Sequence, residues 1–203
     1  MRARVSLLLI TLLITLPACS SKSHRVRLSG FLPSSIALKP SSDDSNMLVY
    51  TRPGFRAGLL QVIHVEPVVT DRVDGLSSEQ RESISSRMTD DIQDALRDAV
   101  HVAEAPAPDT PSLRVALTGL SRSSPLLNIH PATKITGLGL GGVALEAMLV
   151  DTTTHEILYA VALSRDAPKR VGSGLTKWDD AHSVVDQWAR ELAALWSASH
   201  HSP

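Results

Sequence analysis

Two segments of the chain repeat apolar residues every three to four positions, which is the spacing of one face of a helix. The first segment follows Ser77, and Gln80 three residues later completes the pattern of a capping box at a helix start. The second segment occupies residues 175–196. Both patterns predict amphipathic helices. Their apolar faces consist of Ile84, Met88, Ile92, Leu96 and Ala99 in the first helix, and of Ala181, Val184, Val185, Trp188, Leu192 and Leu195 in the second.

Other segments have the two-residue alternation or the β-branched composition that is typical of strands. Strands are expected at residues 59–69, 100–104, 113–117, 143–150 and 156–164, the last two joined by a turn at residues 151–155. The order is therefore strand, helix, several strands, helix. This order predicts an α+β fold: a single mixed, mostly antiparallel sheet with two amphipathic helices packed on one face.

The N-terminal segment has the pattern of an export signal. Arg2 and Arg4 precede an apolar run at residues 5–16, which is shorter than the roughly 20 residues of a membrane-spanning helix. Cys19 stands where this run ends, so the segment resembles a bacterial lipobox, whose cysteine becomes the first mature residue and carries lipid. An ordinary cleaved signal peptide with a free Cys19 is the alternative. The position of the cysteine favours the lipid anchor.

The anchor interpretation divides the chain and places it in the cell. We expect a signal peptide at residues 1–18, a lipidated tether at 19–28, a single periplasmic domain at 29–197 and a disordered tail at 198–203. Ser20 and Ser21 follow the cysteine, and neither is the aspartate that favours inner-membrane retention in enterobacterial sorting. The outer membrane, with the domain facing the periplasm, is therefore expected in preference to the inner membrane.

Composition narrows the range of functions. The formal net charge of -1 argues against a globally basic nucleic-acid binder. A single cysteine excludes an intramolecular disulfide framework and any metal site with several cysteines. No cofactor and no metal are therefore expected from the sequence.

Candidate catalytic patterns are weak. The glycines in residues 137–142 resemble a phosphate loop, but a strand rather than a helix is expected to follow them. His64 and Glu66 share one face of a strand, and two residues do not make a metal site. Ser173 and His182 supply the residue types of a serine hydrolase, without the spacing of a nucleophile elbow. We expect no enzymatic activity, with this hydrolase as the alternative.

Tryptophan is confined to the last predicted helix, at Trp178, Trp188 and Trp196. Trp188 lies on the apolar face, whereas Trp178 in the first turn and Trp196 near the end are candidates for an exposed residue that marks a partner surface. The alternative is that all three tryptophans pack the helix onto the sheet. Trp178, His64 and Glu66 together form the candidate partner surface.

Four short motifs resemble a known bacterial lipoprotein family, the domain of unknown function DUF3313. They are SGFL at residues 29–32, LRVALTGL at 113–120, EAMLVDTTTHE at 146–156 and the segment 178–188 that ends in DQW. The family usually has Thr-Gly-Glu in the hairpin turn, where this chain has His155. The resemblance implies an envelope lipoprotein and brings no activity, cofactor or catalytic residue with it.

These observations together favour a non-catalytic module that is tethered by lipid to the membrane and binds another envelope protein or the cell wall. No nucleic-acid partner is expected. A periplasmic serine hydrolase that uses Ser173 and His182 is one alternative. The other is a carrier of a small ligand or lipid, which requires a sizeable apolar cavity.

Overall fold

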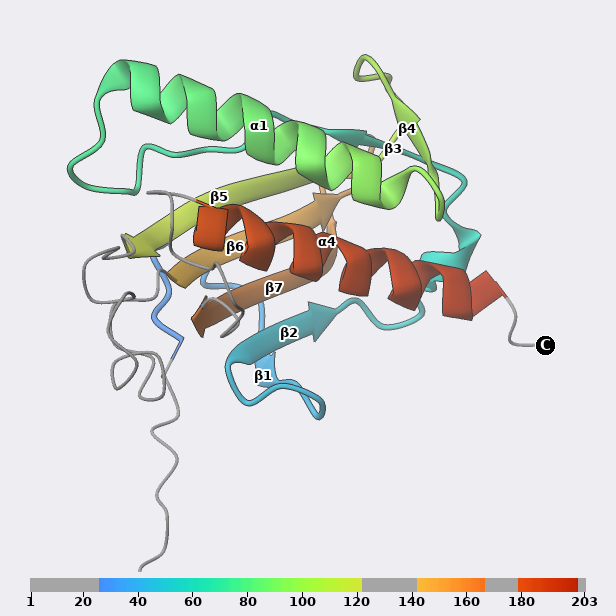
Figure 1. The fold of residues 1–203 in the computed structure, drawn as a ribbon. Coiled ribbons are helices and arrows are strands. Elements are labelled where there is room, and N and C mark those ends of the chain that lie inside the picture. Colours follow the sequence, from blue (N-terminus) through green and yellow to red (C-terminus); the bar gives the residue numbers. More distant parts are fainter. Residues whose placement is uncertain (1–25, 122–141, 167–178, 201–203) are drawn as a thin grey trace, which may run out of the picture.

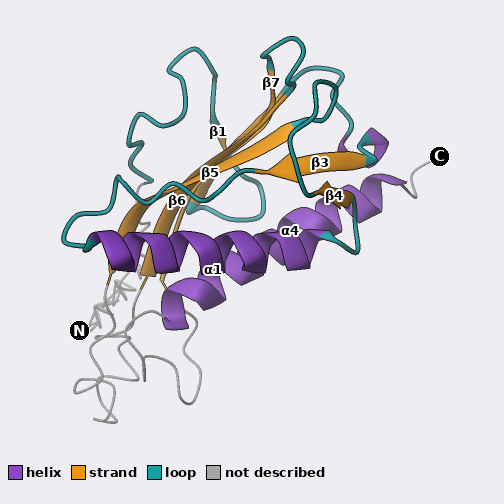
Figure 2. Cartoon of the chain, turned by 90° about the horizontal axis from the view of Figure 1, so that it is seen from above, coloured by secondary structure: helices purple, strands orange, loops and turns teal. Residues whose placement is uncertain are grey.

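The computed structural model describes residues 26–121, 142–166 and 179–200. In this part of the chain, seven strands form one sheet in the order β1-β2-β7-β6-β5-β3-β4, and both long helices lie on the same side of it (Figures 1 and 2). The strands are β1 (Lys39–Pro40), β2 (Met47–Thr51), β3 (Val62–Val65), β4 (His101–Ala103), β5 (Ser112–Ser121), β6 (Gly142–Val150) and β7 (Ile157–Asp166). The helices are η1 (Ala57–Leu59), α1 (Ser78–Leu96) and α4 (Asp179–His200). The predicted α+β class is confirmed.

The sheet is mixed and mostly antiparallel, as the sequence predicts. β3 pairs in parallel with both β4 and β5, and the other neighbours are antiparallel. The strand expected at residues 59–69 is shorter in the structure, because η1 precedes it and Pro67 interrupts its pairing. Proline has no N–H to donate to a ladder, so beyond it only an isolated bridge forms, between Val69 and Ala116.

Helix α1 begins as its capping pattern predicts. The Ser77 hydroxyl accepts a hydrogen bond from the Gln80 backbone N–H (3.2 Å), and the Gln80 side chain accepts one from the Ser77 N–H (3.0 Å). These two bonds satisfy donors that a helix start otherwise leaves unpaired. Four of the five residues of the predicted apolar face are buried, namely Ile84, Met88, Ile92 and Leu96.

The buried face of helix α4 agrees with the prediction except near the C-terminal end of the helix, where a different residue is buried. Val184, Val185, Trp188 and Leu192 are buried as expected. Leu195 is 51% exposed, however, whereas Trp196 is only 2% exposed and takes the place in the core. The prediction for Leu195 is therefore wrong. The last turns of α4 rest against η1 and the edge of the sheet, and the larger indole fills that space.

Strands β1 and β2 are not among the strands expected from the alternation of the sequence. β2 has the sequence MLVYT and lies near the edge of the sheet, where four of its five side chains are half-buried. β1 contributes only Lys39 and Pro40, which pair with Val49 and Leu48. With both faces of β2 partly covered, its residues show no alternation between apolar and polar positions.

The N-terminal segment covers the face of the sheet that points away from the helices, which we call the back face. Leu32 is buried there against Ala160 and Ala162, with Phe31 and Ile36 packed around them. The alternation of β6 places Glu146 on this face, and the side chain is only 1% exposed. Its carboxylate accepts hydrogen bonds from the backbone N–H groups of Ser29 and Leu32.

The turn between β6 and β7 places His155 in the left-handed region, with a φ of 59°. Glycine adopts this conformation without the steric cost that a Cβ brings. The turn is otherwise well bonded, since the Asp151 carboxylate accepts hydrogen bonds from the Thr153 and Thr154 N–H groups, both at 2.9 Å. The hydrogen bond from the Thr154 N–H lowers the pKa of the Asp151 carboxyl. Burial acts in the opposite direction, but its effect is smaller.

Replacing His155 by glycine is expected to raise the free energy of unfolding by about 0.5–1 kcal/mol, because strain leaves the turn while some chain entropy is gained in the unfolded state. Urea denaturation measures the change. Thr154→Gly is the matched control in the same turn, and it should destabilise the protein because the φ of Thr154 is not positive. Equal destabilisation by both variants would contradict this explanation.

Candidate functional site

A groove runs between the C-terminal half of α4 and strand β2, with a cavity volume of about 960 Å³. It forms because α4 packs over β6 and against η1, so the outermost strands β1 and β2 extend beyond the helical layer (Figure 1). The pairing register puts Met47, Val49 and Thr51 on the face of the sheet that carries the helices. These three side chains line the groove from below.

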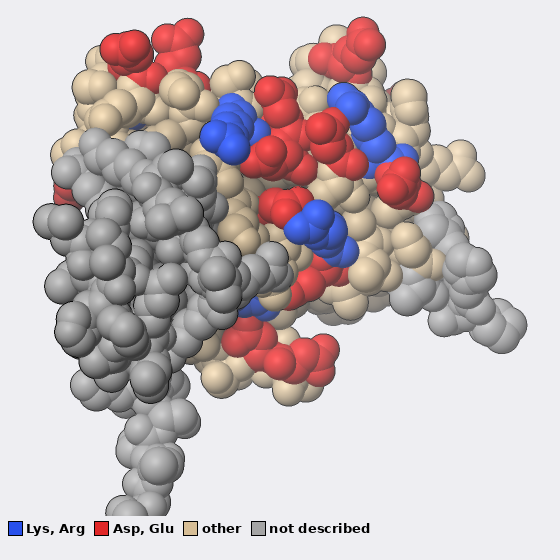
Figure 3. Space-filling view, viewed as in Figure 1, with Lys and Arg blue, Asp and Glu red and all other residues tan. Residues whose placement is uncertain are grey.

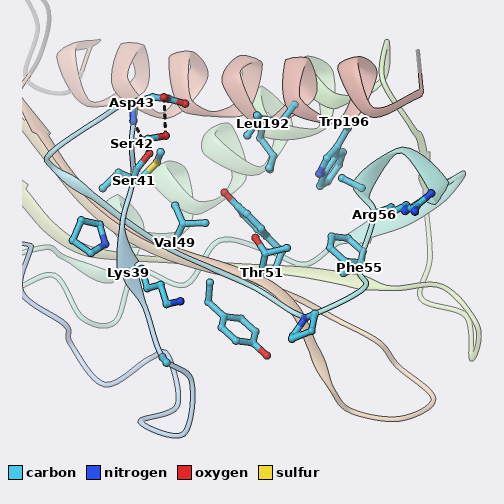
Figure 4. A pocket seen from close by; sticks show the side chains of 18 residues that line it. Lys39, Ser41, Ser42, Asp43, Val49, Thr51, Phe55, Arg56, Leu192 and Trp196 are labelled. Carbon is cyan, nitrogen blue, oxygen red and sulfur yellow. Dashed lines mark hydrogen bonds between the residues drawn. The ribbon is translucent and has the colours of Figure 1, made fainter. Parts of the chain in front are cut away.

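Helix α4 supplies the opposite wall of the groove. Leu192 and Trp196 point toward Val49 and Thr51 in Figure 4, and the exposed Leu195 lies at the lip. Three aromatic side chains line the groove on the helical side: Phe55, Tyr159 and Trp196. Tyr50 also borders the groove, but the pairing register turns its side chain to the back face. In a chain with 3% aromatic residues, this gathering marks the groove as the place where large apolar side chains meet solvent.

The turn after β2 brings Phe55 and Arg56 back to the groove. The Phe55 N–H donates to the Arg52 carbonyl (3.0 Å), and Gly54 inside the turn has a φ of 81°. A residue with a Cβ is strained in that conformation, so glycine suits the turn. Arg56 follows directly and lies at one end of the groove in Figure 4.

Tyr159 carries the most distinctive polar group of the groove. It stands opposite Thr51 in the β2–β7 pairing, and burial raises the pKa of its hydroxyl to about 12. Among the described residues, no group forms a hydrogen bond with this hydroxyl. Buried tyrosine hydroxyls usually have a partner. The Tyr159 hydroxyl is thus a protonated donor that the rest of the described chain leaves available.

An ion-pair cluster around Arg165 fixes the other end of the groove. The guanidinium binds Asp44 in the loop before β2 (2.7 Å) and Glu191 on α4 (2.8 Å), with the Arg165 side chain 17% exposed. Burial acts to lower the pKa of Arg165, and the bonds to Glu191 and Asp44 outweigh it and raise the pKa. This cluster ties the loop to the helix, so that Ser41, Ser42 and Asp43 close this end of the groove (Figure 4).

Charges elsewhere on the helical side are mixed. In Figure 3, basic and acidic side chains lie side by side over the described part of this face. Several of them form pairs along one helix, such as Arg97 with Asp94 and Arg190 with Asp186. Exposed pairs of this kind contribute little to stability.

The candidate partner surface is only partly within the described residues. His64 and Glu66 do share the back face at β3, as predicted, but both are engaged in local contacts. The His64 Nδ1 lies 3.2 Å from the Ala103 carbonyl oxygen. Glu66 accepts hydrogen bonds from the Ser112 hydroxyl (2.6 Å) and from Arg114 Nε (2.8 Å). Burial acts to raise the pKa of Glu66, and these two bonds lower it overall. Trp178 lies outside the described residues.

His182 bridges the two helices. Its Nδ1 lies 3.0 Å from the carboxylate of Asp91 on α1, and the residue is only 8% exposed. Asp91 lies off the apolar face of α1, so the helical pattern does not predict this contact. The contact depends on how α4 crosses α1. Ser173, the proposed nucleophile of the hydrolase alternative, lies outside the described residues, as do the glycines of residues 137–141 and Cys19.

The described part of the chain contains neither a cluster of metal ligands nor a membrane-spanning helix. No group of three or more His, Cys, Asp or Glu residues there is arranged to hold a metal ion. Within the same residues, no helix combines the length and the apolar character that crossing a bilayer requires.

The groove itself was not predicted from the sequence. Its walls come from β2 and η1, which are close in sequence, and from β7 and α4, which follow more than 90 residues later. Sheet pairing brings β7 to β2, and helix packing brings α4 to η1. One signal was present in the sequence. The interval between residues 47 and 57 combines apolar residues, aromatic residues and Gly54, which is typical of a strand followed by a turn.

An α+β domain of one mixed sheet and two helices, with a groove at one sheet edge, is the class that the described structure defines. The chain belongs to the DUF3313 family, described as a protein of unknown function, whose pattern matches residues 27–192. A comparison with curated proteins finds no match.

Two solved structures show how the fold compares with known proteins. The PelC dodecamer from Paraburkholderia phytofirmans has a TM-score of 0.48 and 14% sequence identity, and the match covers 73% of this chain and 96% of that chain. Rare lipoprotein B from Shewanella oneidensis has a TM-score of 0.29 and 16% identity, covering 67% of this chain and 92% of that chain. The likeness concerns the fold alone, and one of these folds belongs to a protein named as a lipoprotein.

Proposed function

We propose that the protein is a non-catalytic binding module of the bacterial envelope, held by lipid on Cys19 at the outer membrane and facing the periplasm. Its partner is another envelope protein or the cell wall. The observation that carries the proposal is the groove between α4 and β2, an open apolar surface that the fold does not cover. The N-terminal signal pattern and lipobox supply the location.

The place where the described chain begins supports this assignment of faces. Ser29 and Leu32 bond to Glu146, and Val26 packs on the back face, so the first described residues lie on the side opposite the helices. The groove opens on the helical side, between α4 and β2. A domain tethered through its back face leaves the groove free for a partner.

Two exposed leucines extend the apolar surface. Leu59 in η1 is 75% exposed, and Leu195 in α4 is 51% exposed. Helix α4 packs against η1, so both leucines belong to the same end of the domain. Exposed leucines that occur singly are ordinary, but a pair beside an aromatic groove has the composition of a protein contact surface.

A non-catalytic role agrees with the way the polar residues are used. Glu66, Glu146 and His182 each form hydrogen bonds that hold one element to another.

Photo-crosslinking in living cells tests the proposal. A photoreactive amino acid replaces Leu59 or Leu195 in the full-length protein, and crosslinked species are separated and identified by mass spectrometry. We expect each site to give the same discrete adduct, with an envelope protein or with peptidoglycan fragments, in the membrane fraction. Leu59 is 75% exposed and Leu195 is 51% exposed, so the probes should disturb the fold little.

The control site is Arg87, an exposed position on α1. It should give no such adduct, because it lies outside the groove. Adducts of equal yield from all three sites, or none from Leu59 and Leu195, would overturn the assignment of the groove as the binding surface.

A further inference from the structure

We propose that the groove between α4 and β2 binds the acyl chain of a single-chain anionic amphiphile, such as a long-chain fatty acid or a lysophospholipid. The proposal goes beyond the proposed function, because it assigns a small ligand, in addition to a protein or cell-wall partner, to the same groove. It separates the groove into an apolar part that takes the chain and a polar end that takes the oxygen atoms of the headgroup.

The apolar part lies between β2 and α4. Met47 and Val49 form its floor, and Leu192 and Trp196 form its wall (Figure 4). The whole groove, with its polar ends included, has a volume of about 960 Å³, at the upper end of the range of about 300–1,000 Å³ that small-molecule sites have. An apolar middle between polar ends suits a flexible chain that carries a headgroup better than a compact polar ligand.

The polar end lies where β2 turns toward η1. Thr51 stands opposite Tyr159 on the same face, and Arg56 lies close to the Thr51 and Phe55 end in Figure 4. The Tyr159 side chain is half-buried, and its hydroxyl, which still reaches solvent, has no hydrogen-bond partner among the described residues. A carboxylate or ester oxygen of the ligand is the acceptor that this donor lacks.

Charge favours an anion at this end. Arg56 is exposed and forms no ion pair within the described residues, unlike Arg52, which pairs with Glu156. The one acidic residue among those that line the groove is Asp43, which lies at the other end, near Lys39 (Figure 4). Asp43 accepts a hydrogen bond from the Ser42 hydroxyl (2.9 Å), so its carboxylate is already engaged.

The experiment uses the full chain with Cys19→Ser, purified from the periplasm without detergent and stripped of bound lipid on a hydrophobic resin. Binding of cis-parinaric acid, a fluorescent 18-carbon fatty acid, is titrated. Unlabelled competitors with 8, 12 and 16 carbons then displace it. We expect saturable binding, with the dissociation constant falling by up to about four-fold for each added methylene group that the groove buries. Methyl palmitate and a zwitterionic lysophospholipid test the headgroup, and lysophosphatidylglycerol tests whether the anionic charge must be a carboxylate.

Three substitutions locate the site. Val49→Trp fills the apolar floor and should weaken palmitate binding at least ten-fold. Arg56→Glu is at an exposed position, so it should fold normally, and it should weaken palmitate about ten-fold but methyl palmitate less than two-fold. Tyr159→Phe should weaken both ligands about five-fold, because both offer an oxygen acceptor. Circular dichroism confirms the fold of each variant.

Arg87→Glu on α1 is the matched charge-reversal control and should bind palmitate like the parent chain. The proposal is overturned if the parent chain shows no saturable binding, if chain length has no effect, or if Arg56→Glu and Arg87→Glu change binding equally. Failure of this titration leaves the crosslinks from Leu59 and Leu195 intact, whereas failure of the crosslinks leaves acyl binding intact. The two proposals therefore fail separately.

Discussion

Glu146→Ala is expected to lower the free energy of unfolding by about 3 kcal/mol. The side chain is 1% exposed, and its carboxylate accepts hydrogen bonds from the N–H groups of Ser29 and Leu32, the latter at 2.9 Å. Removing the acceptor leaves these two donors without a partner, at a cost of about 1–3 kcal/mol for each buried group. A small cavity beneath Leu32 adds to the loss.

Urea denaturation followed by circular dichroism measures the effect of Glu146→Ala. Glu146→Gln keeps the shape and one acceptor oxygen, so its loss should be smaller. The control is Glu82→Ala, since Glu82 is exposed on α1 and should change stability by less than about 0.5 kcal/mol. If Glu146→Ala were as stable as Glu82→Ala, Glu146 would not be what holds the N-terminal segment to the back face.

Loss of the Glu146 carboxylate should also loosen the N-terminal segment from the back face. In the proposed anchor, the segment that Glu146 binds connects the domain to the tether. Leu32 of this segment packs on Ala160 and Ala162. In Glu146→Ala, limited proteolysis should therefore cut within residues 26–38 before it cuts the sheet. The orientation of the tethered domain depends on this attachment.

Cys19→Ser is expected to abolish membrane association completely. The lipobox interpretation places diacylglycerol on the Cys19 thiol and an acyl chain on its amine. Each buried methylene contributes about 0.8 kcal/mol, and several chains together hold a protein stably on a bilayer. Serine cannot form the thioether, so the variant should be found in the soluble periplasmic fraction.

Fractionation of cells into periplasm, inner membrane and outer membrane measures this effect. Ser20→Asp is the matched control next to the cysteine. It keeps the lipid and should stay on a membrane, but it should move from the outer to the inner membrane where the aspartate sorting rule applies. A Cys19→Ser variant that still sedimented with membranes would contradict a lipid anchor at this residue.

Local chemistry explains which parts of the fold were predictable from the sequence. The Ser77–Gln80 capping box marks the start of α1, and both partners lie within one turn of chain. The alternation along residues 143–149 identifies β6, because its helical side is uniformly apolar. Both signals depend on neighbouring residues alone.

The rest of the fold and the groove depend on long-range packing. Glu146 fits the alternation of β6 as an outward polar residue, and only the N-terminal segment, more than a hundred residues earlier, makes its position buried. Leu195 and Trp196 are neighbours in α4, and the helical pattern alone does not say which of them enters the core. Contact of α4 with η1 decides it, and the same contact forms the groove.

His155 occupies a backbone conformation that the preference for glycine at positive φ does not predict. Its left-handed conformation is one that glycine adopts more readily, and the expected hairpin still forms there. The Asp151 carboxylate holds the turn by accepting two backbone hydrogen bonds, which compensates for the strain at His155.

The most direct measurement of the lipid-anchored assignment is the mass of the N-terminal peptide of the protein isolated from membranes. A peptide that begins at Cys19 and carries diacylglycerol on the thiol, with an acyl group on the amine, is the result expected here. A peptide that begins at another residue, or at Cys19 with a free thiol, would contradict the anchor and with it the placement of the groove in the periplasm.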